Sequence, residues 1–232
     1  MVNRFVVHVK NFKVSIKWIF YNYIKFKNHL ELKGYYTLNI YKIWLWKKDA
    51  RYFKVYNTKG ECFFIKMKSE QSIISESRYL NYIYKRNFKM NPFYPKLIKS
   101  NISEFNYNIY RNIDGKKLSD CSFMSDIVEQ MKKILDFLKE HKIVHRDVRP
   151  HNIILKNNAI ILLDFEHCAI KGETDYDTID LNENYSPSER IWDDAFSFKK
   201  IIDEYFKNEE LKNNEFYKNI CDMVGELEYE MV

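Results

Sequence analysis

Apolar and polar residues alternate strictly over the first patterned segment, residues 12–18. The apolar positions are Phe12, Val14, Ile16 and Trp18, and the polar positions between them are Lys13, Ser15 and Lys17. A period of two places successive side chains on opposite faces of an extended chain. The pattern therefore predicts a strand with one buried face over residues 12–18.

A longer strand-like block follows at residues 38–68. Its β-branched and aromatic runs lie near 38–46, 51–57 and 61–67, and short polar turns separate them. The first turn is Lys47-Lys48-Asp49, and the second ends at Gly60, which suits a positive φ. The block predicts three strands joined by tight turns, and residues 104–111 predict a further strand.

Helical periodicity dominates three other segments. Apolar residues recur every three or four positions over 69–87, until two prolines interrupt the chain at 92 and 95. Residues 125–141 carry the clearest stripe, with Ser125 suited to cap the first turn. That stripe consists of Ile127, Val128, Met131, Ile134, Leu135 and Leu138. Residues from about 188 to the end also predict helices.

Two short apolar runs, at 152–155 and 159–165, lie between these helices. They are joined by Asn157-Asn158, and asparagine tolerates the left-handed backbone that a tight turn requires. The sequence therefore predicts a hairpin of two buried strands.

The order of these elements suggests an α+β protein. A chain of 232 residues suits one compact domain or two lobes that share a cleft, and 46% apolar residues suffice for a core. The turn-rich segment "NIDGKKLSD" marks the expected boundary. We predict an N-terminal lobe at 1–111, with a small antiparallel sheet, and a mainly helical C-terminal lobe at 112–232.

Cysteine usage and hydropathy suggest a compartment. The four cysteines, at 62, 121, 168 and 221, show neither a C-x-x-C pair nor a zinc-type spacing with histidine. We interpret them as reduced thiols. No stretch reaches the length of a membrane span, and the start has no clean apolar signal segment. These observations predict a cytoplasmic protein.

The net charge of +6 is unevenly distributed. Residues 1–30 contain no acidic residue, and their basic and aromatic side chains are interleaved: Arg4, Lys10, Lys13, Lys17, Lys25 and Lys27 with Phe12, Trp18, Phe20, Tyr21, Tyr23 and Phe26. Such a segment can bind an anionic bilayer surface or nucleic acid. An ordinary strand and helix with a solvated lysine face explains the same pattern, so charge alone leaves the partner open.

The densest chemistry lies in "IVHRDVRPHNIILKNNAIILLDFEHC", residues 143–168. Asp147 and Asn152 precede the predicted hairpin, and Asp164 follows it. Because a hairpin returns the chain to its start, two carboxylates and an amide oxygen would converge. Hard oxygen ligands of this kind suit Mg²⁺ that carries phosphates, and the remaining carboxylate can accept a proton from an attacking hydroxyl.

These motifs, "HRDVRPHN" and "LLDFE", resemble the catalytic loop and the metal-binding motif of the protein-kinase superfamily. The resemblance implies a two-lobed protein-kinase-like fold with ATP and Mg²⁺ as cofactors. It assigns Asp147 as the catalytic base and Asn152 and Asp164 as metal ligands. Arg149 takes the position of a phosphate-contacting residue, and His145 that of a structural support.

The resemblance extends on both sides of the loop, over about residues 38–205. Lys66, near the end of "GECFFIKMK", matches the lysine that contacts the nucleotide phosphates. Glu76, on the following helix, matches its ion-pair partner better than Glu70, which lies too close to the helix start. In "SPSERIWDDAFSFKKII", Asp194 matches the aspartate that braces the catalytic loop, and Asp193 is one residue out of register.

Three departures qualify the resemblance. The turn in "WKKDA" has no glycine, so Lys47 or Lys48 would replace a glycine-rich phosphate cover. Glu166 replaces the glycine of D-F-G, which disfavours a backbone flip. The segment from 167 to 187 is short and acidic; it is expected to be constitutively placed. The alternative is phosphorylation at Thr174, Tyr176 or Thr178 with Arg146 as the phosphate partner.

In its small size and in these departures, the chain resembles compact bacterial kinases that phosphorylate glycans. Its strand-rich start is similar to that of the lipopolysaccharide core heptose kinases. That resemblance implies a glycan or glycolipid acceptor at the cytoplasmic face of the inner membrane, with residues 1–30 docked on the anionic membrane surface. No specific nucleic acid is expected. The alternatives are a Ser/Thr protein kinase, an inactive kinase-like scaffold and a small-metabolite phosphotransferase.

Overall fold

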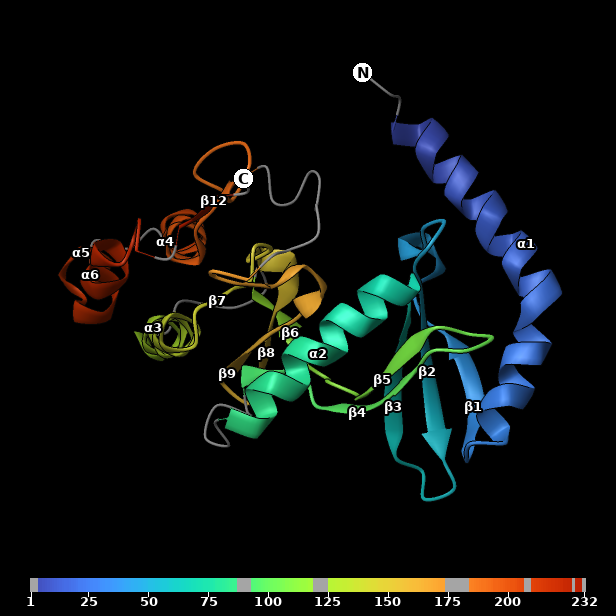
Figure 1. Ribbon diagram of the computed structural model, residues 1–232. Helices are drawn as coiled ribbons and strands as arrows, with labels where there is room; N and C mark the ends of the chain where they lie inside the picture. Colours follow the sequence, from blue (N-terminus) through green and yellow to red (C-terminus); the bar gives the residue numbers. More distant parts are fainter. Residues whose placement is uncertain are drawn as a thin grey trace. The chain divides into compact units, whose positions relative to one another are not determined.

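The computed structural model describes residues 4–86, 93–118, 125–173, 184–206, 210–226 and 228–230. Its contacts divide the chain into two compact units (Figure 1). The first contains residues 1–77 and 96–113, and the second contains residues 78–95 and 114–232. The lobe boundary between 111 and 112 stays a prediction.

The first unit is built on an antiparallel sheet of five strands in the order β1-β2-β3-β5-β4. These strands are β1 (Tyr35–Ile40), β2 (Arg51–Asn57), β3 (Cys62–Met67), β5 (Tyr107–Arg111) and β4 (Leu97–Asn101). The predicted strands near 51–57 and 61–67 are confirmed. Sequence reasoning missed β4, because its half-buried polar residues do not alternate cleanly.

The strand predicted at 12–18 is wrong, because these residues belong to helix α1 (Arg4–Glu31). The alternation covers only seven residues. No glycine or proline occurs before Gly34, so nothing in the sequence interrupts a long helix there. The buried positions Ser15, Phe26 and Leu30 recur at helical spacing. Packing of that face against the sheet therefore decides the secondary structure.

The strand predicted at 38–46 ends early. β1 stops at Ile40, Lys42 has a left-handed φ of 42°, and a 3₁₀ turn, η1 (Ile43–Leu45), follows. This change of direction inserts Trp46 into the core, where it is 1% exposed and its indole N–H donates to the carbonyl of Tyr41 at 3.2 Å. The core around it is aromatic: Phe26, Phe53 and Tyr107 are fully buried with Trp46.

Helix α2 (Glu70–Arg86) follows β3, as the helical spacing predicts. Its first turns, to residue 77, belong to the first unit, and the remainder belongs to the second. In the second unit, α3 (Ser125–Glu140) confirms the predicted stripe. The six residues of that stripe are fully buried: Ile127, Val128, Met131, Ile134, Leu135 and Leu138.

The predicted hairpin consists of β8 (Ile153–Lys156) and β9 (Ala159–Leu162). Asn157 and Asn158 form its turn with φ values of 50° and 62°, which is the left-handed backbone expected there. A short strand, β6 (Lys116–Lys117), joins the same sheet beside β8. Gly115 precedes it and approaches the hairpin closely: a Cβ at this position would lie 2.3 Å from Cγ2 of Ile154.

Short elements frame the hairpin. β7 (Ile143–Val144) pairs with β10 (Ala169–Ile170). The 3₁₀ turn η4 (Pro150–Asn152) precedes β8, and the 3₁₀ turn η5 (Phe165–His167) follows β9. The helices expected after residue 188 are α4 (Asp194–Tyr205), α5 (Glu210–Asn213) and α6 (Glu215–Asp222). Sequence reasoning missed the pairing of β11 (Ile191–Trp192) with β12 (Tyr229–Glu230), because each strand is only two residues long.

Two general expectations concern the whole chain. Cys62, Cys168 and Cys221 are free thiols, and Cys121 lies outside the described residues. Among the described helices, none combines the length and the apolar character that crossing a membrane requires.

Candidate active site

Asp147 lies in the loop between β7 and η4 and is only 1% exposed. The side-chain amide of Asn152 donates to the backbone carbonyl of Asp147 at 2.9 Å and to its carboxylate Oδ2 at 2.7 Å. The guanidinium of Arg149 lies 3.0 Å from the same oxygen. The structure thus brings together three of the residues predicted to carry the chemistry, and it fixes the orientation of the carboxylate.

The environment of Asp147 suits a proton acceptor. Burial raises the pKa of its carboxyl from 3.8 to about 6, although the Arg149 cation favours the ionised form. The negative charge of Asp164 raises the pKa further, and the hydrogen bond from Asn152 lowers it. A carboxylate with a pKa close to neutrality can take a proton more effectively than a solvated one.

Asp194, at the start of α4, braces the loop. Its two carboxylate oxygens accept hydrogen bonds from the backbone N–H groups of His145, at 2.6 Å, and Arg146, at 3.2 Å. The neighbouring Asp193 instead caps α4, because its side chain accepts from the N–H groups of Ala195 and Phe196. The structure thus separates the two adjacent aspartates by function.

His145 is fully buried and neutral. Its Nδ1 lies 3.3 Å from the backbone N–H of Asp147, and its Nε2 lies 3.0 Å from the carbonyl of Leu163. The first nitrogen therefore accepts and the second donates, which defines one neutral tautomer. Burial lowers the pKa of the imidazole to about 4 and keeps it in this form. His145 consequently links the loop before Asp147 to the end of the hairpin.

Asp164 follows β9 in a left-handed conformation, with φ 70° and ψ 59°. Such a backbone is uncommon for residues other than glycine, and aspartate is one of the few that tolerate it. The N–H of Leu163 donates to the carbonyl of Asn152 at 2.8 Å, so the hairpin does return the chain to Asn152. This backbone bond and the turn after it place Asp164 at the hairpin exit.

Glu166 is a residue whose contribution the sequence did not reveal. It is 6% exposed, and one of its carboxylate oxygens lies within 4.8 Å of a carboxylate oxygen of Asp164. Its Oε1 also lies 2.9 Å from Nε2 of His167. The sequence suggested only a missing glycine, whereas the turn η5 directs a second carboxylate toward Asp164. Two acidic residues two positions apart in a tight turn were the available signal.

Asn152, Asp164 and Glu166 therefore supply only oxygen donors: an amide carbonyl and two carboxylates. The Asn152 amide nitrogen makes both hydrogen bonds to Asp147, which leaves its oxygen available to a cation. Hard oxygen donors and excess negative charge are the conditions that Mg²⁺ prefers. The residues present fit a magnesium ion.

In the first unit, Lys66 on β3 and Glu76 on α2 form an ion pair at 2.9 Å. Both are buried, with 6% and 2% exposure. Tyr110, on the neighbouring strand β5, lies beside this pair. The sequence did not predict this contact. Burial raises the pKa of its phenol, and the negative charge of Glu76 raises it further. The sheet therefore places a polar side chain, Tyr110, beside the ion pair.

Lys47 and Lys48 occupy the bend between η1 and β2, and both are exposed. The backbone fixes this bend: the N–H of Lys47 donates to the carbonyl of Ala50 at 3.0 Å, and Arg51 donates to the carbonyl of Lys48 at 3.1 Å. These lysines lie in the first unit with Lys66 and Glu76, whereas the Asp147 loop lies in the second. Their predicted role at the phosphates stays a prediction.

Arg146 has a structural setting of its own. It is 1% exposed, with a φ of 64°, and its guanidinium donates to the backbone carbonyls of His167 and Cys168. The aromatic rings of Trp192 and Tyr229 lie 5.6 Å and 5.3 Å from the guanidinium carbon. Thr174, Tyr176 and Thr178, the phosphorylation candidates, lie outside the described residues.

Comparison with known families supplies the decisive observation. The family model described as "Protein kinase domain" matches residues 57–205, well over half of the chain. The chain belongs to the protein kinase domain family. The matched range contains all the site residues described above except Lys47 and Lys48.

Two individual similarities agree with this family. The chain is 39% identical over 61 residues to an Aurora kinase from Eremothecium gossypii, an alignment that covers 26% of this chain and 17% of that protein. It also resembles the crystal structure of a kinase domain with a TM-score of 0.60 and 15% identity, over 75% of this chain and 64% of the other. The second similarity confirms the predicted two-lobed, kinase-like α+β fold.

Proposed function

We propose that this kinase transfers the γ-phosphoryl group of ATP to an alcohol hydroxyl. The observation that carries the proposal is the environment of Asp147: a buried carboxylate, oriented by Asn152 at 2.7 Å and by Arg149 at 3.0 Å. Family membership supports the reaction class. A side chain held in this way can orient an attacking hydroxyl and accept its proton.

The remaining residues contribute positioning and charge. Arg149, which is 42% exposed at its side chain, can move from Asp147 to offset charge on the transferring group. Lys66, held by Glu76, is proposed to contact the nucleotide phosphates. Asp194 and His145 hold the loop in place without contacting the substrate. Because the transition state of phosphoryl transfer is loose, positioning and electrostatics provide most of the catalysis.

Asn152, Asp164 and Glu166 are proposed to hold the magnesium ion. When bound, Mg²⁺ neutralises charge on the phosphates and aligns them for in-line transfer. Asp164 depends on its left-handed backbone for this role, because φ 70° sets the direction of the side chain as it leaves the hairpin. The hydrogen bonds from the loop backbone to Asp194 also favour an active enzyme over an inactive scaffold.

For the acceptor, we propose a sugar hydroxyl of a lipopolysaccharide core or another cell-surface glycan, met at the cytoplasmic face of the inner membrane. The glycine-free bend at 47–49 and Glu166 support this proposal, since both depart from regulated protein kinases. Arg146 gives further support. Its guanidinium is already held by the carbonyls of His167 and Cys168, so these contacts of Arg146 are made without a phosphate.

A Ser/Thr protein kinase is the second candidate. The match to the protein kinase domain model favours it, as does the local similarity to an Aurora kinase. Both candidates use the same catalytic residues, so the site geometry does not separate them. The acceptor must be distinguished by experiment.

A direct phosphotransfer assay tests both levels of the proposal. Purified protein would be incubated with radiolabelled ATP and Mg²⁺, once with core oligosaccharide and once with generic protein acceptors. We expect label on the oligosaccharide, and none when Asp147→Asn replaces the wild type. Label confined to protein would refute the glycan acceptor but retain the kinase, whereas no label on any acceptor and no ATP turnover would support the inactive scaffold.

A further inference from the structure

Helix α1 exposes a line of large apolar side chains. Phe12, Ile16, Phe20 and Ile24 follow one another at intervals of four residues, so they lie along one face of the helix. Their exposed fractions are 53%, 47%, 82% and 63%. We call these four residues the apolar stripe. At 1.5 Å per residue, the stripe extends over about 18 Å.

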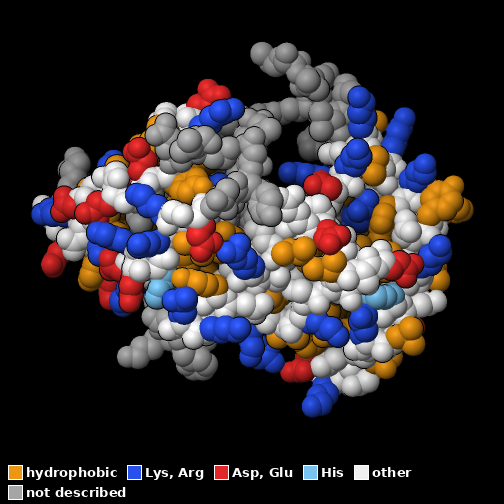
Figure 2. All heavy atoms as spheres, in the orientation of Figure 1, with side chains coloured by type: hydrophobic (Ala, Val, Ile, Leu, Met, Phe, Trp, Pro, Cys, Tyr) orange, Lys and Arg blue, Asp and Glu red, His pale blue; other side chains and the backbone are white. Residues whose placement is uncertain are grey.

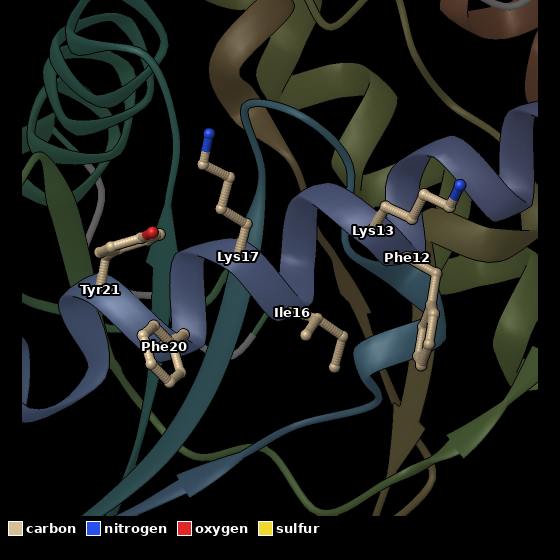
Figure 3. A pocket seen from close by; sticks show the side chains of 6 residues that line it. All are labelled: Phe12, Lys13, Ile16, Lys17, Phe20 and Tyr21. Atoms are coloured by element: carbon tan, nitrogen blue, oxygen red, sulfur yellow. The ribbon is translucent and has the colours of Figure 1, made fainter.

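Basic side chains flank the stripe. Figure 3 shows Phe12, Ile16 and Phe20 pointing to one side of α1, with Lys13, Lys17 and Tyr21 on the adjacent side. These six residues line a shallow groove of about 430 Å³ whose surface is almost entirely apolar. In the space-filling view, lysine and hydrophobic side chains alternate along the edge formed by α1 (Figure 2). The groove lies on one helix, and none of the catalytic residues lines it.

Other side chains of α1 are already committed to the core of the first unit. Phe26 and Leu30 are 0% and 1% exposed in the core against the sheet, and Trp18 packs beside them. The ring of Trp18 also lies 5.0 Å from the guanidinium carbon of Arg51, and the Tyr23 hydroxyl donates to the carbonyl of Leu38. Rotation of α1 to bury the apolar stripe would break these contacts. The stripe therefore faces outward in the folded protein.

We propose that α1 is a membrane-docking helix, whose apolar stripe inserts into an anionic bilayer surface while its lysines bind the lipid headgroups. A helix with large apolar residues on one face and lysines beside them lies in the interface plane and buries its apolar face to a depth of about 5–10 Å. Residues 1–30 contain no acidic side chain, which complements a negatively charged leaflet.

Charge and chemistry favour this occupant over two others. A second copy of the chain would place the lysines of both helices against one another, and like charges at an interface oppose association. A nucleic acid would suit the lysines and the phenylalanines, but Ile16 and Ile24 offer no ring on which a base can stack. A lipid surface accommodates aliphatic and aromatic side chains equally.

Vesicle binding by the full chain provides the test. Flotation would be measured with vesicles of phosphatidylcholine alone and with vesicles that contain 30% phosphatidylglycerol as a stated probe composition. We expect wild type to bind the anionic vesicles at least tenfold more tightly than the neutral ones. Phe12→Gln with Phe20→Gln should weaken that binding about thirtyfold or more, since two exposed rings no longer insert. Lys13→Gln with Lys17→Gln should weaken it about thirtyfold at low salt.

Matched controls use exposed residues elsewhere in the first unit. Ile98→Gln with Ile102→Gln removes two exposed apolar side chains, and Lys59→Gln with Lys99→Gln removes two charges away from α1. Both pairs should bind anionic vesicles within about twofold of wild type. Circular dichroism would verify that every variant is folded, which is expected because the changed side chains face solvent.

Several results would overturn the inference. Equal binding to neutral and anionic vesicles, or unchanged binding by both α1 variants, would exclude it. A dimer that the Phe12 and Phe20 substitutions dissociate, without vesicle binding, would assign the stripe to a second copy; binding to single-stranded RNA without vesicle binding would assign it to nucleic acid. Asp147→Asn should bind vesicles like wild type, so docking and phosphotransfer succeed or fail separately.

Discussion

At Asp147, an amide, a guanidinium and a buried loop converge on a single carboxylate. Asn152 and Arg149 contact the same oxygen, Oδ2, while Asp194 and His145 hold the backbone on which it stands. The carboxylate is therefore oriented by its neighbours. This arrangement makes the chemistry at Asp147 sensitive to the loss of a single side-chain atom.

Replacement of Asp147 by Asn should abolish proton acceptance while preserving shape. We expect kcat to fall by about 10²- to 10⁴-fold, with little change in the KM for ATP, because the loss concerns the transition state. Steady-state assays of ATP turnover with acceptor would measure both constants. Asp136→Asn on the exposed side of α3 is the control and should retain full activity. A similar loss in both variants would contradict the assignment.

The buried pair of Lys66 and Glu76 makes a prediction for stability. Lys66→Met leaves the Glu76 carboxylate buried at 2% exposure without its cation, which should cost about 3–5 kcal/mol in the free energy of unfolding. The double variant Lys66→Met, Glu76→Leu should recover most of that loss but no activity. Urea denaturation and a phosphotransfer assay would separate the two effects. Equal destabilisation by the single and double variants would refute this account.

Asp194 predicts a pH dependence of stability. Burial raises the pKa of its carboxyl from 3.8 to about 7, although hydrogen bonds from two backbone N–H groups favour the ionised form. Between about pH 4 and pH 7 the folded chain therefore keeps a proton that the unfolded chain has released. The free energy of unfolding should fall as pH rises through this window, by up to about 1.4 kcal/mol per pH unit.

The slope, rather than the absolute stability, tests this prediction. Asp194→Asn cannot titrate, so the difference in unfolding free energy between wild type and variant should change across pH 4 to 7 and become constant above it. Chemical denaturation at a series of pH values would measure the difference. A difference that is constant from pH 4 to pH 8 would show that the carboxyl is ionised throughout.

At the scale of the element, the hairpin and α1 show where local pattern suffices and where it fails. The hairpin was predictable because Asn157 and Asn158 supply both left-handed residues of a tight turn between two apolar runs. The alternation over 12–18 pointed to a strand, yet these residues are helical. Seven residues define a period poorly. Burial of Phe26 and Leu30 against a sheet that is remote along the chain stabilises the helix and outweighs the local alternation.

Gly115 supplies the prediction at this scale. A Cβ there would lie 2.3 Å from Cγ2 of Ile154 and 2.5 Å from the carbonyl oxygen of Leu155, so the β6–β8 approach leaves no room for a side chain. Gly115→Ala should therefore lower the free energy of unfolding by about 1–3 kcal/mol. Gly60→Asn is the control: nothing lies within 4 Å of its Cβ position, and asparagine tolerates its φ of +74°. Thermal denaturation of both variants would measure this difference. An unchanged stability of the Gly115→Ala variant would show that the hairpin shifts to accommodate the added Cβ.

At the scale of the whole molecule, the chain consists of two compact units. The first unit supplies Lys66, Glu76 and the outward face of α1, and the second supplies the Asp147 loop and the proposed metal ligands. A ligand that binds only the folded state stabilises that state by mass action. ATP and Mg²⁺ together should therefore stabilise the folded protein more than either does alone.

We expect ATP with Mg²⁺ to raise the unfolding free energy by about 2.7 kcal/mol at a concentration a hundred times the Kd. Either component alone should give a smaller increase. Asp164→Asn should remove the contribution of Mg²⁺, because one of the carboxylates proposed to hold the ion is lost. Thermal shift measurements with ATP, Mg²⁺ and both would reveal this pattern. Equal shifts with ATP alone and with ATP plus Mg²⁺ would exclude a magnesium site.

The sequence by itself determined the hairpin between Asn152 and Asp164 and the buried stripe of α3, and it indicated the loop residues that are proposed for catalysis. These features depend on short-range spacing and turn chemistry, which are written into neighbouring residues. Only the tertiary structure decided the helical state of α1, the early end of β1 and the carboxylate that Glu166 adds beside Asp164. Each of these depends on contacts between residues remote along the chain, or on the direction of a side chain in a tight turn, and a linear pattern records neither.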